Sequence, residues 1–265
     1  VVLTAGGFVM NRAMVEQHCA QVIPYAEPYG SPWDMGDGIQ MGLAAGANVV
    51  NMSEVFLSLA IYPPAKLTFG LLINAVGQRF VNEDAYLARL AHYAVQQEAQ
   101  EVYLLVQNED FEMSHYMDPL HIAGTGDTIE EVEREAGLPE GSLQQTVAYY
   151  NGFAANGEDP LFHKAPSWIK PLDKPPYALL SYAPRDVKYP LGEAPGYLMF
   201  TLGGLQTLPT GEVLTPQGDF IPGLYAAGRT TAGLPRTSKG YASGMSVGDA
   251  TFFGRLAGRQ AAGNC

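Results

Sequence analysis

The sequence is poor in cysteine, in basic residues and in long apolar runs, and each shortage excludes a class of protein. Its two cysteines among 265 residues, Cys19 and Cys265, lie near opposite ends, with no CxxC pair and no histidine at zinc-ligand spacing. This pattern excludes a disulfide framework and a structural zinc site. We therefore expect a reduced, cytoplasmic protein that binds no metal.

Basic charge is scarce: 15 Lys and Arg residues stand against 27 Asp and Glu residues, for a formal net charge of −12 at pH 7. Because nucleic acids and anionic membranes are bound through basic surfaces, neither is an expected partner. Apolar residues make up 47% of the chain, yet their runs are far shorter than the ~18 residues that span a bilayer. The sequence predicts a full hydrophobic core and no membrane span.

The first residues lack the basic stretch, apolar core and cleavage site of a secretory signal peptide. Residues 1–7, Val-Val-Leu-Thr-Ala-Gly-Gly, instead predict a buried strand that runs into a glycine turn. An opening of this kind, without an initiator methionine, is typical of the interior of a protein.

Helices are predicted where a capping residue precedes a periodic or small-residue segment, and strands where short apolar runs end in turn residues. A helix of small residues can pack closely on a sheet or a ligand. The predicted helices are 14–22, capped by Asn11; 38–47, made of small residues; one that Asp127 or Thr128 begins and Gly137 ends; one from Ser142; and 246–262. The predicted strands include 101–106 and 223–228.

The glycine-rich turn at residues 244–248, Gly-Met-Ser-Val-Gly, allows three interpretations. It has the form of the nucleophile elbow of a serine hydrolase, with Ser246 as nucleophile. It can also open a helix whose free backbone N–H groups point at the edge of a flat cofactor, with Ser243 or Ser246 as cap. The third interpretation is an ordinary capped helix, whose glycines allow it to pack closely against a strand.

The context of the turn does not favour the elbow. The preceding residues are polar and glycine-rich, whereas an elbow needs a buried strand before the serine and a histidine after it. All five histidines lie before the turn: His18, His92, His115, His121 and His163. An esterase with Ser246 or Ser243 as nucleophile stays the alternative hypothesis, since Lys239 and Tyr241 could activate a hydroxyl without histidine.

Several motifs, in order along nearly the whole chain, resemble the superfamily of fumarate reductase and 3-ketosteroid dehydrogenase flavoproteins. IPGLYAAGRTTAG and GYASGMSVGDATFFGRLAGRQAA are similar to its C-terminal flavin-binding signature. VVLTAGGF resembles the family's strand that returns from the FAD domain, GDGIQMGLAAGA the next helix, and GLLINAVGQRFVNEDAY the entry to the substrate domain. TIEEVEREAGL and SLQQTVAYYNGFAANGEDPLF resemble the helical stretch that follows.

The resemblance implies an α+β fold, in which a substrate domain is flanked by parts of an α/β FAD-binding domain. The implied domains are 1–50 and 196–265 for the FAD-binding parts and 51–195 for the substrate domain. The family's N-terminal GxGxxG half has no counterpart in this sequence. The chain is therefore expected to be a fragment, a subunit whose second chain supplies that half, or a natural truncation, and to bind FAD weakly alone.

Details of the resemblance favour the steroid branch, closest to 3-ketosteroid Δ4-(5α)-dehydrogenases. Fumarate-reductase-like members carry a histidine before the glycine pair that matches 203–204, and an arginine cluster for a dicarboxylate, where this sequence has Phe200 and Thr201. The implied reaction is removal of a proton beside the C3 carbonyl of a small hydrophobic substrate such as a steroid, with hydride transfer to FAD.

The resemblance also implies the catalytic residues. Tyr241 would donate a hydrogen bond to the C3 carbonyl, with help from backbone N–H groups near Ser246, and Ser243 would line the pocket. Tyr86 matches the position of the base, although a small gap would exchange it with Tyr93. Because a phenol has a pKa of about 10, that base needs a polar partner or relay.

The cofactor-binding residues come from the same resemblance. Arg229 is a departure, because many relatives place an acid there, near the flavin ribityl chain. The implied residues are Gly6, Gly7, Gly228, Arg229, Gly244, Ser246 and Val247. A third hypothesis is a non-catalytic module that binds a steroid or lipid beside MSEVFLSLAIYPP.

Overall fold

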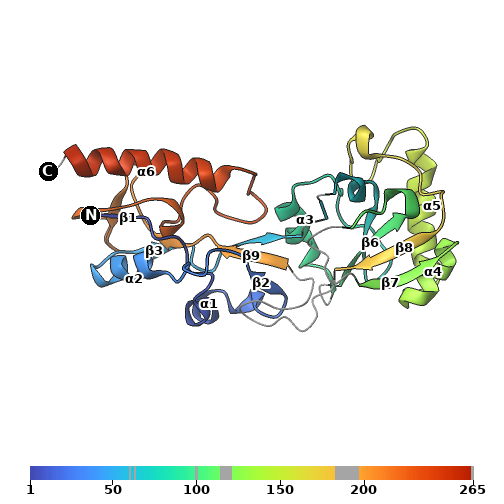
Figure 1. Cartoon of the computed structure of the whole chain (residues 1–265), viewed down its shortest axis with the longest axis horizontal. Coiled ribbons are helices and arrows are strands. Elements are labelled where there is room, and N and C mark those ends of the chain that lie inside the picture. Colours follow the sequence, from blue (N-terminus) through green and yellow to red (C-terminus); the bar gives the residue numbers. More distant parts are fainter. Residues whose placement is uncertain (60, 63, 99–100, 114–120, 183–196, 264–265) are drawn as a thin grey trace. The chain divides into compact units, whose positions relative to one another are not determined.

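The computed structural model describes residues 1–59, 61–62, 64–98, 101–113, 121–182 and 197–263, and mixes helices with small sheets (Figure 1). It divides into two compact units. The first takes in Val1–Leu57 and the chain from Leu198 onward, and the second begins at Ser58. The α+β class expected from the sequence is confirmed.

The first unit contains the sheet on which the C-terminal helix packs. β1 (Val2–Leu3) pairs parallel with β12 (Phe220–Ala226), and β12 pairs antiparallel with β11 (Glu212–Leu214). The helix α6 (Met245–Gly263) begins one residue before its predicted start. Its contact with the sheet is apolar and involves Tyr225, Ala227 and Ala257, with Val2, Phe253 and Ala261 at the margin.

Two smaller sheets accompany it. One has the order β2 (Ala26–Pro28), β9 (Tyr197–Thr201), β4 (Val55–Ser58), and the other pairs β10 (Gly204–Leu205) with β3 (Val49–Val50). The helix α2 (Asp37–Ala44) lies against β10, and a Cβ added at Gly42 would come within 2.5 Å of the Leu205 side chain. This close contact confirms the expected packing of the small-residue helix.

The helix α1 (Arg12–His18) follows its predicted cap. The Asn11 side chain accepts a hydrogen bond from the Met14 N–H at 3.2 Å. The helix ends earlier than predicted, because the chain passes at Cys19 into a 3₁₀ turn at Ala20–Val22.

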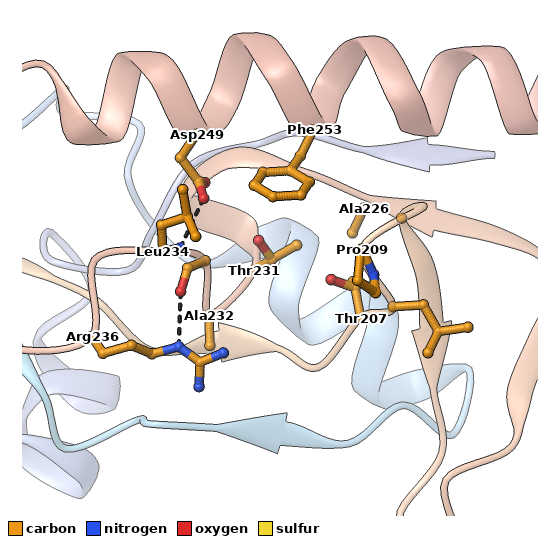
Figure 2. Close-up of a pocket in the computed structure, with 12 residues that line it drawn as sticks. Thr207, Pro209, Ala226, Thr231, Ala232, Leu234, Arg236, Asp249 and Phe253 are labelled. Atoms are coloured by element: carbon orange, nitrogen blue, oxygen red, sulfur yellow. Dashed lines mark hydrogen bonds between the residues drawn. The ribbon is translucent and has the colours of Figure 1, made fainter.

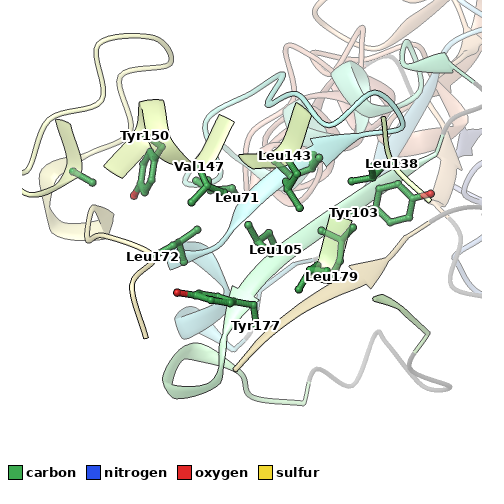
Figure 3. Packing of buried hydrophobic residues seen from close by; sticks show 13 residues of the cluster. Leu71, Tyr103, Leu105, Leu138, Leu143, Val147, Tyr150, Leu172, Tyr177 and Leu179 are labelled. Carbon is green, nitrogen blue, oxygen red and sulfur yellow. The ribbon is translucent and has the colours of Figure 1, made fainter. Parts of the chain in front are cut away.

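The second unit is built on a four-stranded antiparallel sheet with the order β5-β6-β8-β7. Figure 3 shows apolar side chains of this sheet, such as Leu105 and Leu179, against Leu143, Val147 and Tyr150 of a covering helix. The strands are β5 (Leu71–Asn74), β6 (Val102–Gln107), β7 (Ile122–Gly126) and β8 (Tyr177–Ser181); the helices are α3 (Leu87–Ala94), α4 (Ile129–Ala136) and α5 (Ser142–Ala154).

The caps of α4 are local and were predictable. Thr128 and Glu131 form a reciprocal capping box, and Gly137 ends the helix in the left-handed region at φ 71°. A longer-range cap joins α4 to α5: the buried carboxylate of Glu133 accepts hydrogen bonds from the Gly141 and Leu143 N–H groups, each at 2.7 Å. These bonds satisfy donors at the start of α5 that have no partner within the helix.

A buried ion cluster also belongs to the second unit. Arg79 pairs with Glu83 at 2.9 Å and with Asp159 at 3.0 Å, and Lys164 pairs with Glu83 at 3.1 Å. Each of these side chains is at most 3% exposed. Two cations therefore balance two anions, as burial of charge requires.

The units change over between Leu57 and Ser58, whereas the boundary predicted between residues 195 and 196 lies outside the described residues. The roles assigned to the three predicted segments stay predictions. Among the helices that the structure describes, none is both long enough and apolar enough to cross a bilayer.

Candidate functional site

The glycine turn after β1 is held by two polar side chains. Gly6 has φ 81°, and a Cβ there would come within 2.3 Å of Asp34 Oδ1. A Cβ at Gly7 would come within 2.7 Å of the hydroxyl oxygen of Thr201, which accepts a hydrogen bond from the Phe8 N–H. Both predicted cofactor-binding glycines are thus required by close packing within the protein itself.

Arg229 lies where β12 ends, directly after Gly228, which has φ 66°. Its guanidinium pairs with Asp34 at 2.5 Å, and its central carbon lies 5.3 Å from the ring centre of Phe200. The residue that departs from the family pattern therefore has a partner within this chain, and its charge is balanced there.

Phe200 belongs to an aromatic cluster, defined here as Phe56, Phe200 and Tyr241. The rings of Phe56 and Phe200 are stacked, with centres 4.3 Å apart and planes 9° apart. Tyr241 meets both edge-on, at 4.6 Å from Phe56 and 5.7 Å from Phe200. Such offset and T-shaped contacts fix the orientation of each ring.

The hydroxyl of Tyr241 reaches the first turn of α6. It donates a hydrogen bond to Ser246 Oγ at 2.8 Å. Two side chains that the sequence predicted to be catalytic are thus in contact, with the tyrosine ring fixed by the aromatic cluster. Ser243 precedes the helix and is exposed.

The start of α6 presents backbone donors beside open space. Gly244 has φ 82°, and a Cβ added there would meet no atom within 4 Å. Among the described residues, none accepts a hydrogen bond from the N–H groups of Ser246 or Val247. Val247 is also 68% exposed. Unsatisfied N–H groups at a helix start attract electron-rich atoms.

The other two predicted tyrosines lie in the second unit. Tyr86 is half-buried and immediately precedes α3, where it has the N-cap position. Tyr93 lies near the end of the same helix, and its ring meets that of His92 edge-on at 5.2 Å. The choice between them as base stays a prediction.

The surroundings of Ser246 do not form a nucleophile elbow. The residues directly before it, 232–244, form no strand. In the part of the chain that the structure describes, the hydroxyl of Ser246 is hydrogen-bonded to Tyr241 alone, and no histidine reaches it. A hydrolytic serine needs a base that accepts its proton.

Sequence reasoning missed Asp34 as part of this site, and it included Phe56 only as a member of the MSEVFLSLAIYPP segment of the third hypothesis. Phe56 lies on β4 and Asp34 in the loop before α2, far along the chain from their partners Phe200 and Arg229. Asp34 carries no local sequence motif. The charge of Arg229 was the one available signal, because it needs an acidic partner, but it does not indicate which acidic residue that partner is.

Two curated relatives illustrate what the chain is similar to. A probable fumarate reductase, Ifc3, of Shewanella frigidimarina is 28% identical over 276 residues, which cover 99% of this chain and 44% of the relative. A 3-oxosteroid 1-dehydrogenase of Mycobacterium tuberculosis is 27% identical over 294 residues, which cover 97% of this chain and 51% of the relative. The chain thus spans about half the length of these relatives.

Among solved structures, a 3-ketosteroid Δ4-(5α)-dehydrogenase from Rhodococcus jostii RHA1, in complex with 4-androstene-3,17-dione, matches with a TM-score of 0.81. The two chains are 36% identical, and the match covers 99% of this chain and 52% of the other. The expected resemblance to flavoproteins that include steroid dehydrogenases and fumarate reductases is confirmed.

The family described as "FAD binding domain" matches residues 1–244. This match and the flavoprotein relatives indicate FAD as the cofactor. With most of its length matched, this chain belongs to the FAD-binding flavoprotein family.

Proposed function

We propose that this chain is part of an FAD-dependent oxidoreductase that dehydrogenates a 3-oxosteroid-like substrate. The observation that carries the proposal is the hydrogen bond from Tyr241 to Ser246, on an aromatic cluster and beside free backbone donors. Because the relatives are about twice as long, the FAD site in this proposal includes residues outside this chain, on the same polypeptide or a second one.

The start of α6 fits the electron-rich edge of a flavin ring. Gly244 leaves open space, and the N–H groups of Ser246 and Val247 are free to donate to carbonyl or ring nitrogen atoms. Gly6, Gly7, Gly228 and Arg229 would line the same site through the turns that follow β1 and β12. When bound, FAD supplies the acceptor for the substrate's hydride.

The aromatic cluster favours an apolar substrate over a dicarboxylate. A flat ring system can pack on Phe200, which is half-buried, whereas Phe56 is 6% exposed and stacks on the Phe200 ring. Recognition of a dicarboxylate needs arginine side chains free to form paired hydrogen bonds. Arg229, the arginine in contact with this cluster, already pairs with Asp34.

Tyr241 would polarise the C3 carbonyl of the substrate. Its hydroxyl can turn its proton toward the carbonyl oxygen, while Ser246 Oγ–H donates in turn to the phenol oxygen. A donor that itself accepts a hydrogen bond is a stronger donor. Charge that develops on the carbonyl oxygen as the neighbouring proton leaves would be stabilised by this pair.

Tyr86 would accept that proton, and Tyr93 is the alternative base. To act as a base near neutral pH, a phenol needs a polar partner or relay. Ser243, exposed just before α6, would line the substrate pocket.

The test is anaerobic. The protein is loaded with FAD, desalted, and mixed with a saturated 3-oxosteroid while the flavin absorbance bands are recorded. We expect these bands to bleach as the steroid is oxidised, and the Tyr241→Phe variant to keep bound FAD but to bleach far more slowly.

Fumarate is the control substrate, offered to the chemically reduced protein. Reoxidation by fumarate without any bleaching by the steroid would reject the steroid substrate and favour a fumarate-like one. Protein that retains no FAD even when the remaining part of the FAD site is supplied, on the same polypeptide or a second one, would reject the cofactor role of this chain.

A further inference from the structure

A cavity lies in the first unit, between α6 and the loops that follow β10 and β12. Its volume is about 380 Å³, within the range of small-molecule sites. Figure 2 shows Asp249 and Phe253 descending into it from α6, with Thr231 and Arg236 on the loop side. None of the residues assigned to the proposed flavin or steroid site lines this cavity.

Asp249 is a buried carboxylate with a free oxygen. The residue is 4% exposed, and its Oδ1 accepts a hydrogen bond from the Leu234 N–H at 2.8 Å. Within the described part of the chain, Oδ2 has no hydrogen-bond donor and no cation within ion-pair distance. Among the described residues, Oδ2 is not one of the buried side-chain atoms that lack a partner, so this oxygen is open to the cavity that Asp249 lines.

Arg236 supplies the opposite charge. Its Nε donates to the carbonyl oxygen of Gly233 at 2.9 Å, which fixes the guanidinium against the loop. Its terminal nitrogen atoms have no acceptor among the residues that the structure describes. Asp249 and Arg236 therefore line one cavity with opposite charges, each without an ion-pair partner.

The rest of the lining is largely apolar. Ala226, Pro209 and Phe253 form part of the wall (Figure 2). Leu208 and Leu234, which also line the cavity, are 40% and 60% exposed. Exposed leucines beside a cavity gain free energy when an apolar group covers them.

We propose that this cavity binds a small zwitterion with an apolar body, of the α-amino-acid class. Its ammonium group would donate to Asp249 Oδ2, its carboxylate would accept from the terminal N–H groups of Arg236, and its side chain would pack on Phe253 and the leucines. A ligand with only an ammonium group would leave Arg236 without a partner and place a second positive charge near it. A ligand with only a carboxylate would leave Asp249 without a partner and be repelled by its negative charge. The two protein charges together select the zwitterion.

Calorimetric titration with three probes tests the proposal: L-phenylalanine, phenethylamine and 3-phenylpropionate. They share an aromatic body and differ in which charged groups they carry. We expect L-phenylalanine to bind at least ~10-fold more tightly than either single-charge probe, since each paired group adds a charge-assisted hydrogen bond.

Two variants assign the contacts. Arg236→Gln, at an exposed side chain, should abolish the preference for L-phenylalanine over phenethylamine, and Asp249→Asn should abolish its preference over 3-phenylpropionate. Arg255→Gln removes the same charge from an exposed position of α6 outside the cavity and should change neither preference.

If Asp249→Asn does not fold, the Arg236→Gln comparison alone decides. The proposal is overturned if L-phenylalanine binds no more tightly than the single-charge probes, or if Arg236→Gln and Arg255→Gln behave alike.

Discussion

Tyr241 is the side chain on which the proposed reaction depends most. Replacing it with phenylalanine keeps a ring against Phe56 and Phe200 and removes the hydroxyl that contacts Ser246. We predict that Tyr241→Phe lowers kcat of the FAD-loaded protein by more than ~100-fold, because one donor to the developing oxyanion is lost. Single-turnover flavin bleaching measures the effect.

The matched control for that change is Tyr149→Phe, which removes a hydroxyl from a half-exposed ring in the second unit. It should leave kcat unchanged. A loss of only a few-fold in Tyr241→Phe would show that this hydroxyl has no part in catalysis.

Gly6 offers a second test at the scale of one residue. Its φ of 81° and the 2.3 Å approach to Asp34 Oδ1 leave no room for a Cβ. We predict that Gly6→Ala lowers the free energy of unfolding by about 2 to 3 kcal/mol more than Gly46→Ala, because both variants carry the backbone strain and only Gly6→Ala adds a steric clash. Gly46 has φ 91° and no atom within 4 Å of the added Cβ. Equal losses of unfolding free energy in urea denaturation would show that the Asp34 side chain moves aside at no cost in free energy.

At the scale of elements, one carboxylate joins two helices of the second unit. Glu133 of α4 accepts hydrogen bonds from three backbone N–H groups at the start of α5, those of Gly141, Leu143 and Gln144, and from the Gln144 side chain. Burial alone would raise the pKa of Glu133, but these hydrogen bonds outweigh it and lower that pKa below its usual value.

This lowered pKa predicts a pH dependence. The stabilising contribution of Glu133 is fully present above the pKa of an unfolded glutamate, about 4.3, and is lost as the pH falls through the lower folded value. Near neutral pH we expect Glu133→Gln to cost about 1 to 3 kcal/mol of unfolding free energy. The difference between wild type and variant, measured by urea denaturation from neutral pH downward, should shrink below that pKa. A difference independent of pH would contradict the role of the charge.

At the scale of the whole chain, buried charges bring distant segments of the second unit together. Lys164 pairs with Glu83 at 3.1 Å and donates to the Gly70 carbonyl oxygen at 2.9 Å. Burial is the main cause that lowers the pKa of Lys164, and Glu83 opposes this shift. We predict that Lys164→Met costs about 3 to 5 kcal/mol of unfolding free energy, since it leaves the cluster with an uncompensated buried carboxylate.

The comparison for that prediction is Lys174→Met. Lys174 is 61% exposed and pairs with Glu109 at the surface, so its replacement should have little effect. Chemical denaturation of both variants at neutral pH separates the two cases, and similar losses would show that burial of the Lys164 charge is not what stabilises the unit.

Much of the local structure could be predicted from the sequence, because helix ends depend on contacts within a few residues. Asn11 caps α1 and Gly137 ends α4, as the sequence indicated, and of the two predicted caps for α4, Asp127 and Thr128, the structure has Thr128. The family was also predictable, since its motifs are short and follow one another in order along the chain, and the match to residues 1–244 confirms it.

Interacting residues that lie far apart in the sequence could not be predicted, because only the tertiary fold brings them into contact. Arg229 and Asp34 are 195 positions apart, and no local pattern marks either as the other's partner. In the sequence, Asp249 lies within a predicted helix and has no motif that sets it apart. Packing of α6 over the loop at Leu234 places its side chain in the lining of a cavity. The sequence by itself determined helix ends, strand segments and family, which depend on neighbouring residues; tertiary structure decided which charges are neutralised and which face a cavity, because those energies depend on burial.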